Sequence, residues 1–504
     1  MASLPLLLET AFTAHYVLIL VVFLPTAWHT WASYSKLADF KGPLLARFSS
    51  LWLTSAMSSK RANLQFYEVS QKYGDLARIG PNTLLTSDPE MIIRMSSARS
   101  RYTRSRWYSG QKLEVDHDNL FSTIDEATHS KKRAQLATGY SGKDIDGLEA
   151  MIDSHVIELM NLIRRKYLSD GSTFRPMDFA RKSAFFTMDV ITDIAFGRSW
   201  GCLIADDDVF KWFESLEIIM PNAIKASTIP WLSSLFDIPF LKKLVAPSEK
   251  DKIGPGKLIA VAKEIAQKRF AEENPGRHRD MMGSFIRHGI NPTNAASEAI
   301  LQIIAGGDTT ATTIRATTLF VITNPQVYST LQSEIDSSVT SGAIISDVEA
   351  RQLPYLQAVI REGARMWVPA TGLASKVVPP EGDTINGRFL PGGTLIGKSD
   401  WAIQRSKAIY GEDSTIFKPE RWLEARGEPL EKMERTLGLI WGHGKNSCLG
   451  KNIAWIELNK VFFELFKNFD ITIADPSNPW KSLNYGLWVQ KDMFVKITQR
   501  KMSY

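Results

Sequence analysis

The residue with the clearest chemical potential is Cys448, which lies in the decapeptide Trp-Gly-His-Gly-Lys-Asn-Ser-Cys-Leu-Gly, residues 441–450. Gly444 lets the backbone turn close beneath a flat ligand because it has no Cβ atom, and Gly450 lets the following helix begin close to that ligand. A thiolate at a helix N-terminus is stabilised by free N–H groups and by the helix dipole. The pattern is typical of a metal-binding loop, although a lone cysteine is also a common small hydrophobic core residue.

A second candidate is the segment Ala305–Thr310, within a helical pattern from about Ala295 to Phe320. Two adjacent glycines and a run of threonines are poor helix formers. In mid-helix they weaken the hydrogen-bond ladder and permit a kink. An opened turn can hold water and direct the Thr309 hydroxyl toward a cofactor, with Asp308 beside it as a proton carrier. The alternative is a helix that ends at the two glycines.

Two further patterns involve charged residues. Glu362 and Arg365 have i,i+3 spacing, which places both on one helix face, and Pro-Glu-Arg-Trp, which contains Arg421, follows before the cysteine loop. His129 and Arg133 have i,i+4 spacing and also share a face. Taken alone, the first pattern is an ion pair of little energetic value, and the second is typical of a solvated basic helix.

These motifs, in this order along the chain, resemble those of the cytochrome P-450 family. The decapeptide is similar to the family's haem-binding loop, aromatic-x-x-Gly-x-Arg-x-Cys-x-Gly, with two differences. Trp441 stands where Phe is usual, and Asn446 stands where Arg or His holds a haem propionate. The segment Ala305–Thr310 matches the family's oxygen-binding helix, Ala/Gly-Gly-x-Asp/Glu-Thr-Thr/Ser.

The resemblance implies a role for each motif. Cys448 becomes the axial ligand of haem b iron, and such a thiolate favours O–O cleavage. Thr309 hydrogen-bonds dioxygen or its water, and Asp308 connects the site to bulk protons. A partly buried charge cluster behind the haem fixes the cysteine loop and is structural rather than catalytic: Glu362, Arg365 and Arg421.

The same resemblance implies how the propionates are held. His129 stands where the family often has Trp, and Arg133 and His129 are expected to bind propionates. Lys376 occupies a position that is often a propionate-binding Arg. These groups would compensate for the charge that Asn446 lacks. The remaining loop residues in contact with the cofactor are Trp441, Gly444 and Gly450.

Composition narrows the class of protein. The chain has 504 residues, 44% of them hydrophobic, enough to bury a sizeable core. The formal net charge of +6 is spread along the chain without an aromatic-interleaved basic stripe, so nucleic acid is not expected as a partner. Only two cysteines are present, which excludes a disulfide framework and fits a reducing compartment. We expect Cys202 to be structural.

The N-terminus predicts a membrane anchor. No Asp, Glu, Lys or Arg occurs from Thr10 to Ser35, and such a stretch is long enough to cross a bilayer as a helix. We assign residues 1–10 to the lumen, 11–33 to the transmembrane anchor and 34–504 to a cytosolic haem domain, because the basic residues follow the span. A cleaved signal peptide would need a basic start and a small-residue cleavage site, which are missing. Family members commonly have one such anchor in the endoplasmic reticulum membrane.

The remaining chain is predicted to be mainly helical with a minor β part. A hairpin is expected at Leu76–Thr86 around Gly-Pro-Asn, and Asp88-Pro89 and Asn324-Pro325 predict helix starts. Residues 145–370 read as helices with breaks at 200–208 and 247–256, and residues 376–398 read as strand and turn. The resemblance implies the cytochrome P-450 fold, with a long central helix over the haem and a small β-rich subdomain.

The function implied is a membrane-anchored haem-thiolate monooxygenase. It would take electrons from a flavoprotein, NADPH–cytochrome P-450 reductase, and use dioxygen to oxidise a small apolar or amphipathic substrate. The sequence as a whole resembles filamentous-fungal members of the family that act on polyketides, alkaloids, terpenoids or hybrid peptides in secondary metabolism. Two alternatives stay open: desaturation, ring expansion or rearrangement at the same site, and a haem-binding protein without turnover.

Likeness to the family also suggests surfaces around the site. A basic docking face for the reductase is expected from four lysines: Lys131, Lys132, Lys445 and Lys451. Substrate choice is expected to depend on five places in the chain: Arg106–Ser122, Phe210–Leu244, Ile303, Ala370–Ala374 and Tyr485–Trp488.

Overall fold

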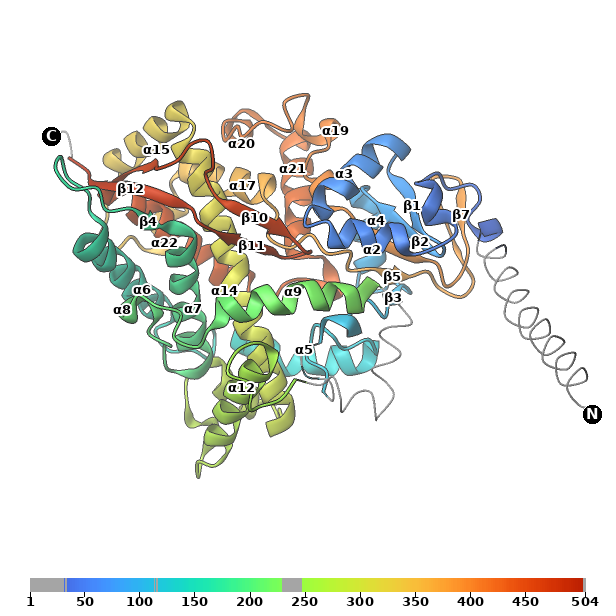
Figure 1. Cartoon of the computed structure of the whole chain (residues 1–504), viewed down its shortest axis with the longest axis horizontal. Coiled ribbons are helices and arrows are strands. Elements are labelled where there is room, and N and C mark those ends of the chain that lie inside the picture. The colour runs from blue at the N-terminus through green and yellow to red at the C-terminus, as the bar shows by residue number, and fades with distance from the viewer. Residues whose placement is uncertain (1–30, 32–33, 113, 115–116, 229–246, 502–504) are drawn as a thin grey trace, which may run out of the picture.

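The computed structural model describes residues 31, 34–112, 114, 117–228 and 247–501. The predicted lumenal segment and, apart from Trp31, the predicted anchor up to residue 33 lie outside these residues. Within the described part of the chain, no helix combines the length and apolar character that a membrane span requires. The architecture is mainly helical with minor sheets (Figure 1), in agreement with the fold class predicted for the haem domain.

The centre of the molecule is the long helix α14 (Pro292–Ile322), which begins at Asn291, whose side chain accepts a hydrogen bond from the N–H of Asn294. It continues without interruption through Gly306 and Gly307, so the alternative of a helix end at these glycines is wrong. The apolar side chains and close packing of helix α7 (Phe179–Phe196) explain this continuity, because α7 is buried almost throughout and runs against α14. Tertiary packing therefore overrides weak local propensity.

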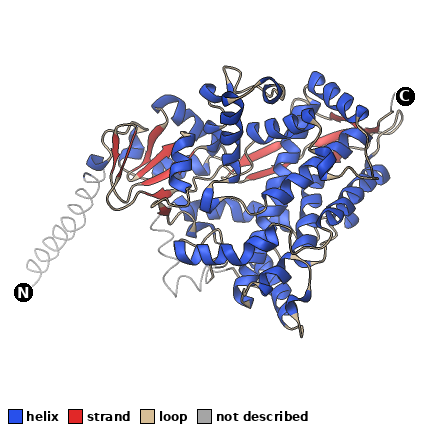
Figure 2. Ribbon diagram, turned by 180° about the vertical axis from the view of Figure 1, so that it is seen from behind, coloured by secondary structure: helices blue, strands red, loops and turns tan. Residues whose placement is uncertain are grey.

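Several other helices pack against this pair, and helices make up most of the described structure (Figure 2). The longer ones are α2 (Leu51–Ser58), α3 (Ala62–Tyr73), α4 (Pro89–Ser96), α5 (Glu126–Tyr140), α6 (Leu148–Leu162), α9 (Trp212–Thr228), α12 (Pro255–Phe270), α15 (Pro325–Ser337), α17 (Pro354–Met366), α21 (Glu428–Gly438) and α22 (Lys451–Asn468). The shorter ones are α8 (Cys202–Ala205), α13 (Met281–Arg287), α16 (Asp347–Ala350), α18 (Asp400–Ile403), α19 (Lys407–Tyr410) and α20 (Arg421–Glu424).

Strands form a subdomain next to the described N-terminal end and smaller groups elsewhere (Figures 1 and 2). The largest sheet has the order β1-β2-β8-β5-β3, from β1 (Leu76–Gly80), β2 (Thr83–Thr86), β3 (Thr103–Arg104), β5 (Lys376–Val377) and β8 (Leu395–Lys398). The others are β6 (Asp383–Ile385) with β7 (Arg388–Leu390), β10 (Lys481–Asn484) with β11 (Trp488–Lys491), and β4 (Met177–Asp178) with β12 (Phe494–Gln499) and β9 (Phe469–Ile473).

Local sequence signals are confirmed where the chain supplies its own partners. The predicted hairpin is the antiparallel pair β1–β2, with Leu76 opposite Thr86. The Asp88 side chain accepts a hydrogen bond from the Glu90 N–H at the start of α4. The predicted break at residues 200–208 contains α8, which sequence reasoning missed. Its first N–H groups are bound by the buried carboxylate of Asp189 on α7, a cap that comes from another helix and is invisible in the local pattern.

One buried histidine joins α6 to α7. His155 lies between the carboxylates of Glu158 (2.9 Å) and Asp193 (3.1 Å). Burial disfavours the charged imidazole, but the hydrogen bonds to Asp193 and Glu158 outweigh it and raise the pKa of His155 to about 9. Because this pKa exceeds that of an unfolded histidine, the charged network stabilises the folded state below about pH 6.5 and loses its contribution as the pH rises through about 9.

We therefore expect His155→Gln to destabilise the protein more at pH 6 than at pH 10. The two effects on the free energy of unfolding should differ by ~3 kcal/mol, since each pKa unit corresponds to ~1.4 kcal/mol. Urea unfolding of both proteins at the two pH values measures this difference. An equal loss of stability at pH 6 and pH 10 would contradict a charged His155.

Candidate haem site

The cysteine loop is closed by its own backbone. The Cys448 N–H donates to the carbonyl of Trp441 at 2.6 Å, and α22 begins three residues after the cysteine at Lys451. Cys448 is exposed, whereas Cys202 is buried; neither forms a disulfide. Burial nevertheless raises the pKa of the Cys448 thiol. The N–H groups of Gly450 and Lys451 and the charge of Arg133 lower the pKa, but by less. Because Cys448 is accessible although the protein surrounds it, its side chain borders an open space inside the molecule.

The glycines of the loop have different roles. Gly444 has a φ of +54°, and a Cβ atom there would lie 2.3 Å from the carbonyl oxygen of Ser96 at the end of α4. Position 444 therefore requires glycine because the backbone of α4 leaves no room for a Cβ atom. The direction of a Cβ at Gly450 is open except for the Cys448 sulfur at 4.0 Å. Trp441 lies next to Trp455 of α22, with ring centroids 6.2 Å apart.

The middle of α14 also borders open space. Ala305 is exposed and Thr309, one turn later, is half-buried, while Asp308, Thr310 and Thr312 are buried. A small apolar residue left uncovered on a central helix marks a face that no other described element covers. The Thr309 hydroxyl lies on this face and donates to the carbonyl of Ala305 at 2.7 Å. The structure thus separates Thr309 from Asp308, whose carboxylate pairs with Arg315 at 3.3 Å on another side of the helix.

Two cations hold the residues that immediately precede Cys448. Arg133 donates from Nη1 to the Ser447 carbonyl and from Nη2 to the Ser447 hydroxyl, both at 2.8 Å. Lys376 donates from Nζ to the Asn446 side-chain oxygen at 2.5 Å. The pair Lys376–Asn446 thus occupies the place at which sequence comparison expected a single arginine or histidine.

Sequence reasoning missed Arg104, which the sheet brings to the same place. Arg104 of β3 is the register partner of Lys376 of β5, and like charges directly opposite in a sheet are destabilising. Burial, followed by repulsion from Arg104, lowers the pKa of Lys376 to about 7, while Glu126 opposes this effect. The sequence places Arg104 among four other arginines between residues 94 and 106, and its partner Lys376 is more than two hundred residues away, so no local signal singles Arg104 out.

His129 is neutral in this cluster. Burial and the neighbouring charge of Arg104 lower the pKa of His129 to about 4. The Arg104 Nη2 lies 2.7 Å from the His129 Nε2. Since a guanidinium only donates, Nε2 must accept, and the proton lies on Nδ1. That N–H is buried and has no hydrogen-bond partner among the described residues.

The cluster has more positive charge and more donors than the described protein balances. One carboxylate, Glu126, lies among four cations and pairs with one of them, Lys445, at 3.1 Å. The other three cations are Arg104, Arg133 and Lys376. Buried donors that lack an acceptor in the described structure are Arg104 Nε, Trp107 Nε1, His129 Nδ1 and Asn446 Nδ2. Buried cations and donors require acidic acceptors. An acidic ligand beside Cys448 satisfies this requirement.

Comparison with known proteins shows the family of the chain. The family model of cytochrome P450 matches residues 41–497. The chain belongs to the cytochrome P450 family. A protein of Pyricularia oryzae named cytochrome P450 monooxygenase ABA1 is 41% identical over 98% of each chain. The monooxygenase aba1 of Botryotinia fuckeliana is 39% identical over 90% of each chain, and abl1 of Leptosphaeria maculans is 36% identical over 91% of this chain and 82% of its own length.

The family implies a haem cofactor, and the residues of this cytochrome P450 fit one. Cys448 supplies a sulfur at a helix N-terminus, Gly450 leaves space beside it, and Ala305 borders open space on α14. A haem carries two carboxylates, the chemistry that the unbalanced cations and unpaired donors require. The assignment of the individual cofactor-binding residues stays a prediction.

Behind the loop, the structure brings Glu362, Arg365 and Arg421 together. All three are buried, and Glu362 and Arg365 are fully so. Arg365 donates to both oxygens of Glu362 at 2.8 and 2.7 Å, and Arg421 donates to Oε1 at 2.9 Å. Trp422 Nε1 and the Lys418 N–H complete the shell at 2.9 and 3.0 Å. The carboxylate is thus fully paired, as a buried charge requires.

This cluster reaches the cysteine loop through Gln404. Arg365 donates to the Gln404 carbonyl at 2.6 Å, and the Gln404 side chain donates to the carbonyl of Thr436 at 2.8 Å. Thr436 lies in α21, which leads directly to the turn that contains Trp441. The contacts give a physical route by which the ion cluster can fix the loop.

The predicted docking lysines divide into two groups. Lys131 and Lys451 are exposed. Lys132 donates to the Asp118 carbonyl, and Lys445 pairs with Glu126 and lies near the carbonyls of Ser100 and Tyr102. Tertiary contacts therefore engage Lys132 and Lys445, and a docking face made of the four lysines stays a prediction.

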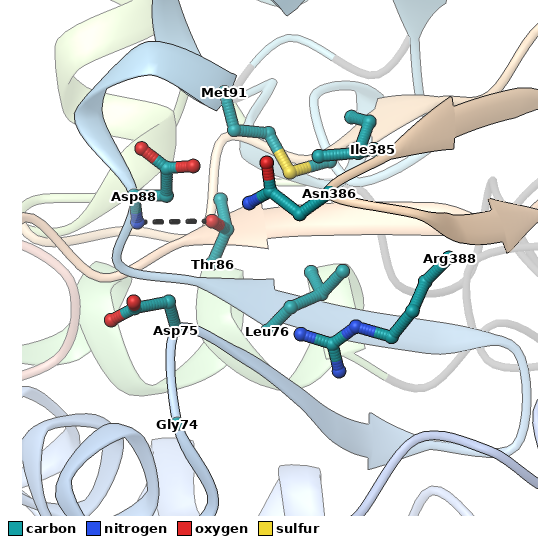
Figure 3. Close-up of a pocket in the computed structure, with 9 residues that line it drawn as sticks. All are labelled: Gly74, Asp75, Leu76, Thr86, Asp88, Met91, Ile385, Asn386 and Arg388. Carbon is teal, nitrogen blue, oxygen red and sulfur yellow. Dashed lines mark hydrogen bonds between the residues drawn. The ribbon is translucent and has the colours of Figure 1, made fainter.

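A separate pocket of about 270 Å³ lies in the β-rich subdomain (Figure 3). It is bordered by β1, β2, α4 and the β6–β7 hairpin, and none of its nine lining residues belongs to the motifs above. Its polar side chains are mostly engaged locally: Asp88 caps α4, and its N–H is bound by the Thr86 hydroxyl at 3.1 Å. We assign no chemistry to this pocket.

We expect Glu362→Gln to lower the free energy of unfolding by ~3–5 kcal/mol, because it leaves the buried Arg365 without a charged partner, whereas Arg421 keeps Asp413. The haem content of the purified protein should fall with it. Thermal unfolding and the ratio of haem to protein absorbance measure the two effects.

The matched control is Arg361→Gln on the same helix, which breaks an exposed pair with Glu434 (2.9 Å). It should cost no more than ~1 kcal/mol. Equal effects of the two substitutions on stability and haem content would refute the structural role of the buried cluster.

Proposed function

We propose that this cytochrome P450 is a membrane-anchored haem-thiolate monooxygenase that oxidises a small apolar or amphipathic metabolite in fungal secondary metabolism. Dioxygen and electrons from an NADPH-dependent flavoprotein reductase are its co-substrates. Membership of the family and the names of the fungal relatives support the reaction class. The observation that carries the proposal is the accessible Cys448 thiol beside a buried, unbalanced cation cluster.

The haem, when bound, supplies the activation of dioxygen and the transfer of oxygen to substrate. Cys448 holds it at the α22 N-terminus, where the N–H groups of Gly450 and Lys451 favour the thiolate. Arg104, Arg133 and Lys376, with their neighbours, bind its carboxylates. These contacts orient the cofactor and balance its charge, so the protein's contribution is mainly electrostatic and geometric.

Two side chains of α14, those of Thr309 and Asp308, deliver protons to the site. The Thr309 hydroxyl faces the open side of the helix and can donate to a reacting oxygen when it releases the Ala305 carbonyl. Asp308 supplies a carboxyl group one residue away, and its burial raises the pKa of the acid while Arg315 lowers it. A positioned alcohol and a nearby acid are a competent pair for proton delivery.

The substrate-facing walls are apolar. An aromatic cluster of Trp107, Tyr108 and Phe121 has ring centroids 5.2–6.1 Å apart, and Phe121 is 40% exposed. Tyr108 donates to the carbonyl of Ala374 at 3.2 Å, so the first and fourth predicted substrate segments lie together. Ala374 has a φ of +44°, a strained conformation of the kind that clusters at ligand sites. Much of the segment Phe210–Leu244 lies outside the described residues.

The apolar surface that follows the predicted anchor supports membrane attachment. Leu44, Leu45, Phe48 and Leu51 are all exposed, Leu44 by 71%. They lie 9 to 16 residues after the uncharged N-terminal segment, with Lys41 just before them and Arg47 among them. Apolar side chains with basic neighbours suit the interface between lipid tails and anionic headgroups.

The reaction class is tested by Cys448→Ser. The reduced wild-type protein in carbon monoxide should give the absorption spectrum of a thiolate-ligated haem, and the variant should give none and should not support NADPH-dependent turnover. Thermal unfolding of both proteins controls for misfolding. A folded variant that retains the thiolate spectrum would overturn the assignment of the axial ligand.

The anchor is tested by deletion of residues 1–35. The full chain should remain in microsomal membranes after an alkaline wash, because a spanning helix holds it, and the deleted form should be released. Leu44, Phe48 and Leu51 replaced together by serine should remove any residual binding of the deleted form. Val339→Ser, at an exposed apolar residue elsewhere, is the control. Full-length protein in the soluble fraction would contradict the anchor.

A further inference from the structure

Arg315 is a fully buried cation that the motifs above do not include. It lies on α14, two turns beyond Asp308, and is 1% exposed. Its Nε donates to the carbonyl of Ala180 at 2.9 Å and to the hydroxyl of Ser183 at 3.1 Å, both on α7. Helix α7 therefore fixes the base of the guanidinium and leaves its outer nitrogens to face other partners.

One outer nitrogen is shared between two acceptors. Nη1 lies 3.3 Å from Asp308 Oδ1 and 3.4 Å from Gln490 Oε1 on β11. Both distances exceed the ~2.7–2.9 Å of a tight charge-assisted hydrogen bond. Gln490 is held in turn through its side-chain nitrogen by the hydroxyl of Ser482 on β10 at 3.2 Å. Asp308 is thus held loosely, and a neutral acceptor lies beside it at almost the same distance.

The helix geometry explains why this matters for Thr309. Residues seven apart lie on nearly the same side of an α-helix, whereas adjacent residues are about 100° apart. The pairing with Arg315 therefore keeps the Asp308 carboxylate away from the face of Ala305 and Thr309. From α7, the Thr187 hydroxyl donates to the Gly307 carbonyl at 2.7 Å and fixes the turn that contains both residues. Strand β11, which pairs with β10, contacts both α14 and α7 (Figure 1).

We propose that Arg315 is the positioning residue for Asp308, and that Gln490 is a reserve acceptor that keeps the guanidinium paired when the carboxyl group is protonated or turns away. The inference rests on the proton-carrying role of Asp308 in the proposed function. The guanidinium keeps its protons throughout. The proton that Asp308 takes up comes from water and passes on to the Thr309 side.

The charges around Asp308 fit this arrangement. Burial raises the pKa of Asp308, and the charge and hydrogen bond of Arg315 lower it. Asp178, at the start of α7, is the further carboxylate that acts on Arg315. The remaining described groups against the guanidinium are neutral: Ala180, Ser183 and Gln490. A change of charge at Arg315 or Gln490 should therefore shift the pKa of Asp308: added negative charge raises it, and added positive charge lowers it.

The test is an infrared pH titration of the full-length, haem-loaded protein in detergent, with the carboxyl band of Asp308 assigned by its loss in Asp308→Asn. Arg315→Gln should move the midpoint up by at least about one pH unit, and Arg315→Lys should restore most of the shift. Gln490→Glu, which adds a competing carboxylate, should move it up. Gln490→Leu, which leaves Asp308 as the sole acceptor at Nη1, should move it down. Gln302→Leu is the control for a buried substitution on α14.

Opposite shifts for the two Gln490 variants are an outcome that loss of packing alone does not produce. An unchanged midpoint in Arg315→Gln and in both Gln490 variants would overturn the inference, and the Gln490 variants decide it if Arg315→Gln does not fold. The carbon monoxide spectrum of each variant is measured in parallel. A wild-type protein without a thiolate spectrum would refute the proposed function, whereas a thiolate spectrum with unmoved Asp308 midpoints would refute this inference alone.

Discussion

The carboxylate of Glu362 is the interaction on which the rest of the site depends. It accepts hydrogen bonds from two arginines, a tryptophan and a backbone N–H at full burial. A buried charge tolerates no loss of partners, since breaking such a cluster leaves an uncompensated charge. The segments that supply those partners must therefore keep their positions relative to Glu362. Through Gln404 and Thr436, this constraint extends to the helix that carries the cysteine loop.

The front of the loop has the opposite electrostatic character. There the described protein leaves cations and donors without enough acidic acceptors, around Arg104, Lys376 and His129. The fully paired cluster is stable by itself, whereas the under-paired cluster is complete only with an acidic ligand. In the proposed function, the fully paired cluster fixes the backbone of the loop, and the under-paired cluster binds and orients the cofactor. The pair Lys376–Asn446 brings a cation of β5 to the loop position at which the family pattern has an arginine or histidine.

Much of the architecture could be predicted because its signals are local. The β1–β2 hairpin, the caps at Asp88 and Asn324 and the helix after Cys448 each depend on residues close in the chain. The motifs around Cys448, Thr309 and Glu362 could be found for the same reason. Helix α8 could not, since its cap is supplied by Asp189 from another helix. Continuity of α14 at Gly306 was also undecided, because packing against α7 outweighs the propensity of glycine.

The sequence by itself determined the chemical inventory: a single cysteine in a glycine-containing loop, a Gly-Gly-Asp-Thr-Thr helix segment and the residues of one buried ion cluster. The tertiary structure alone decided which side chains share an environment. It placed Arg104 opposite Lys376, turned Asp308 toward Arg315 and away from the face of Thr309, and occupied Lys132 and Lys445 with internal contacts. Such pairings arise because sheet registry and helix packing join residues remote in sequence, and because electrostatic effects depend on distance and burial rather than on order along the chain.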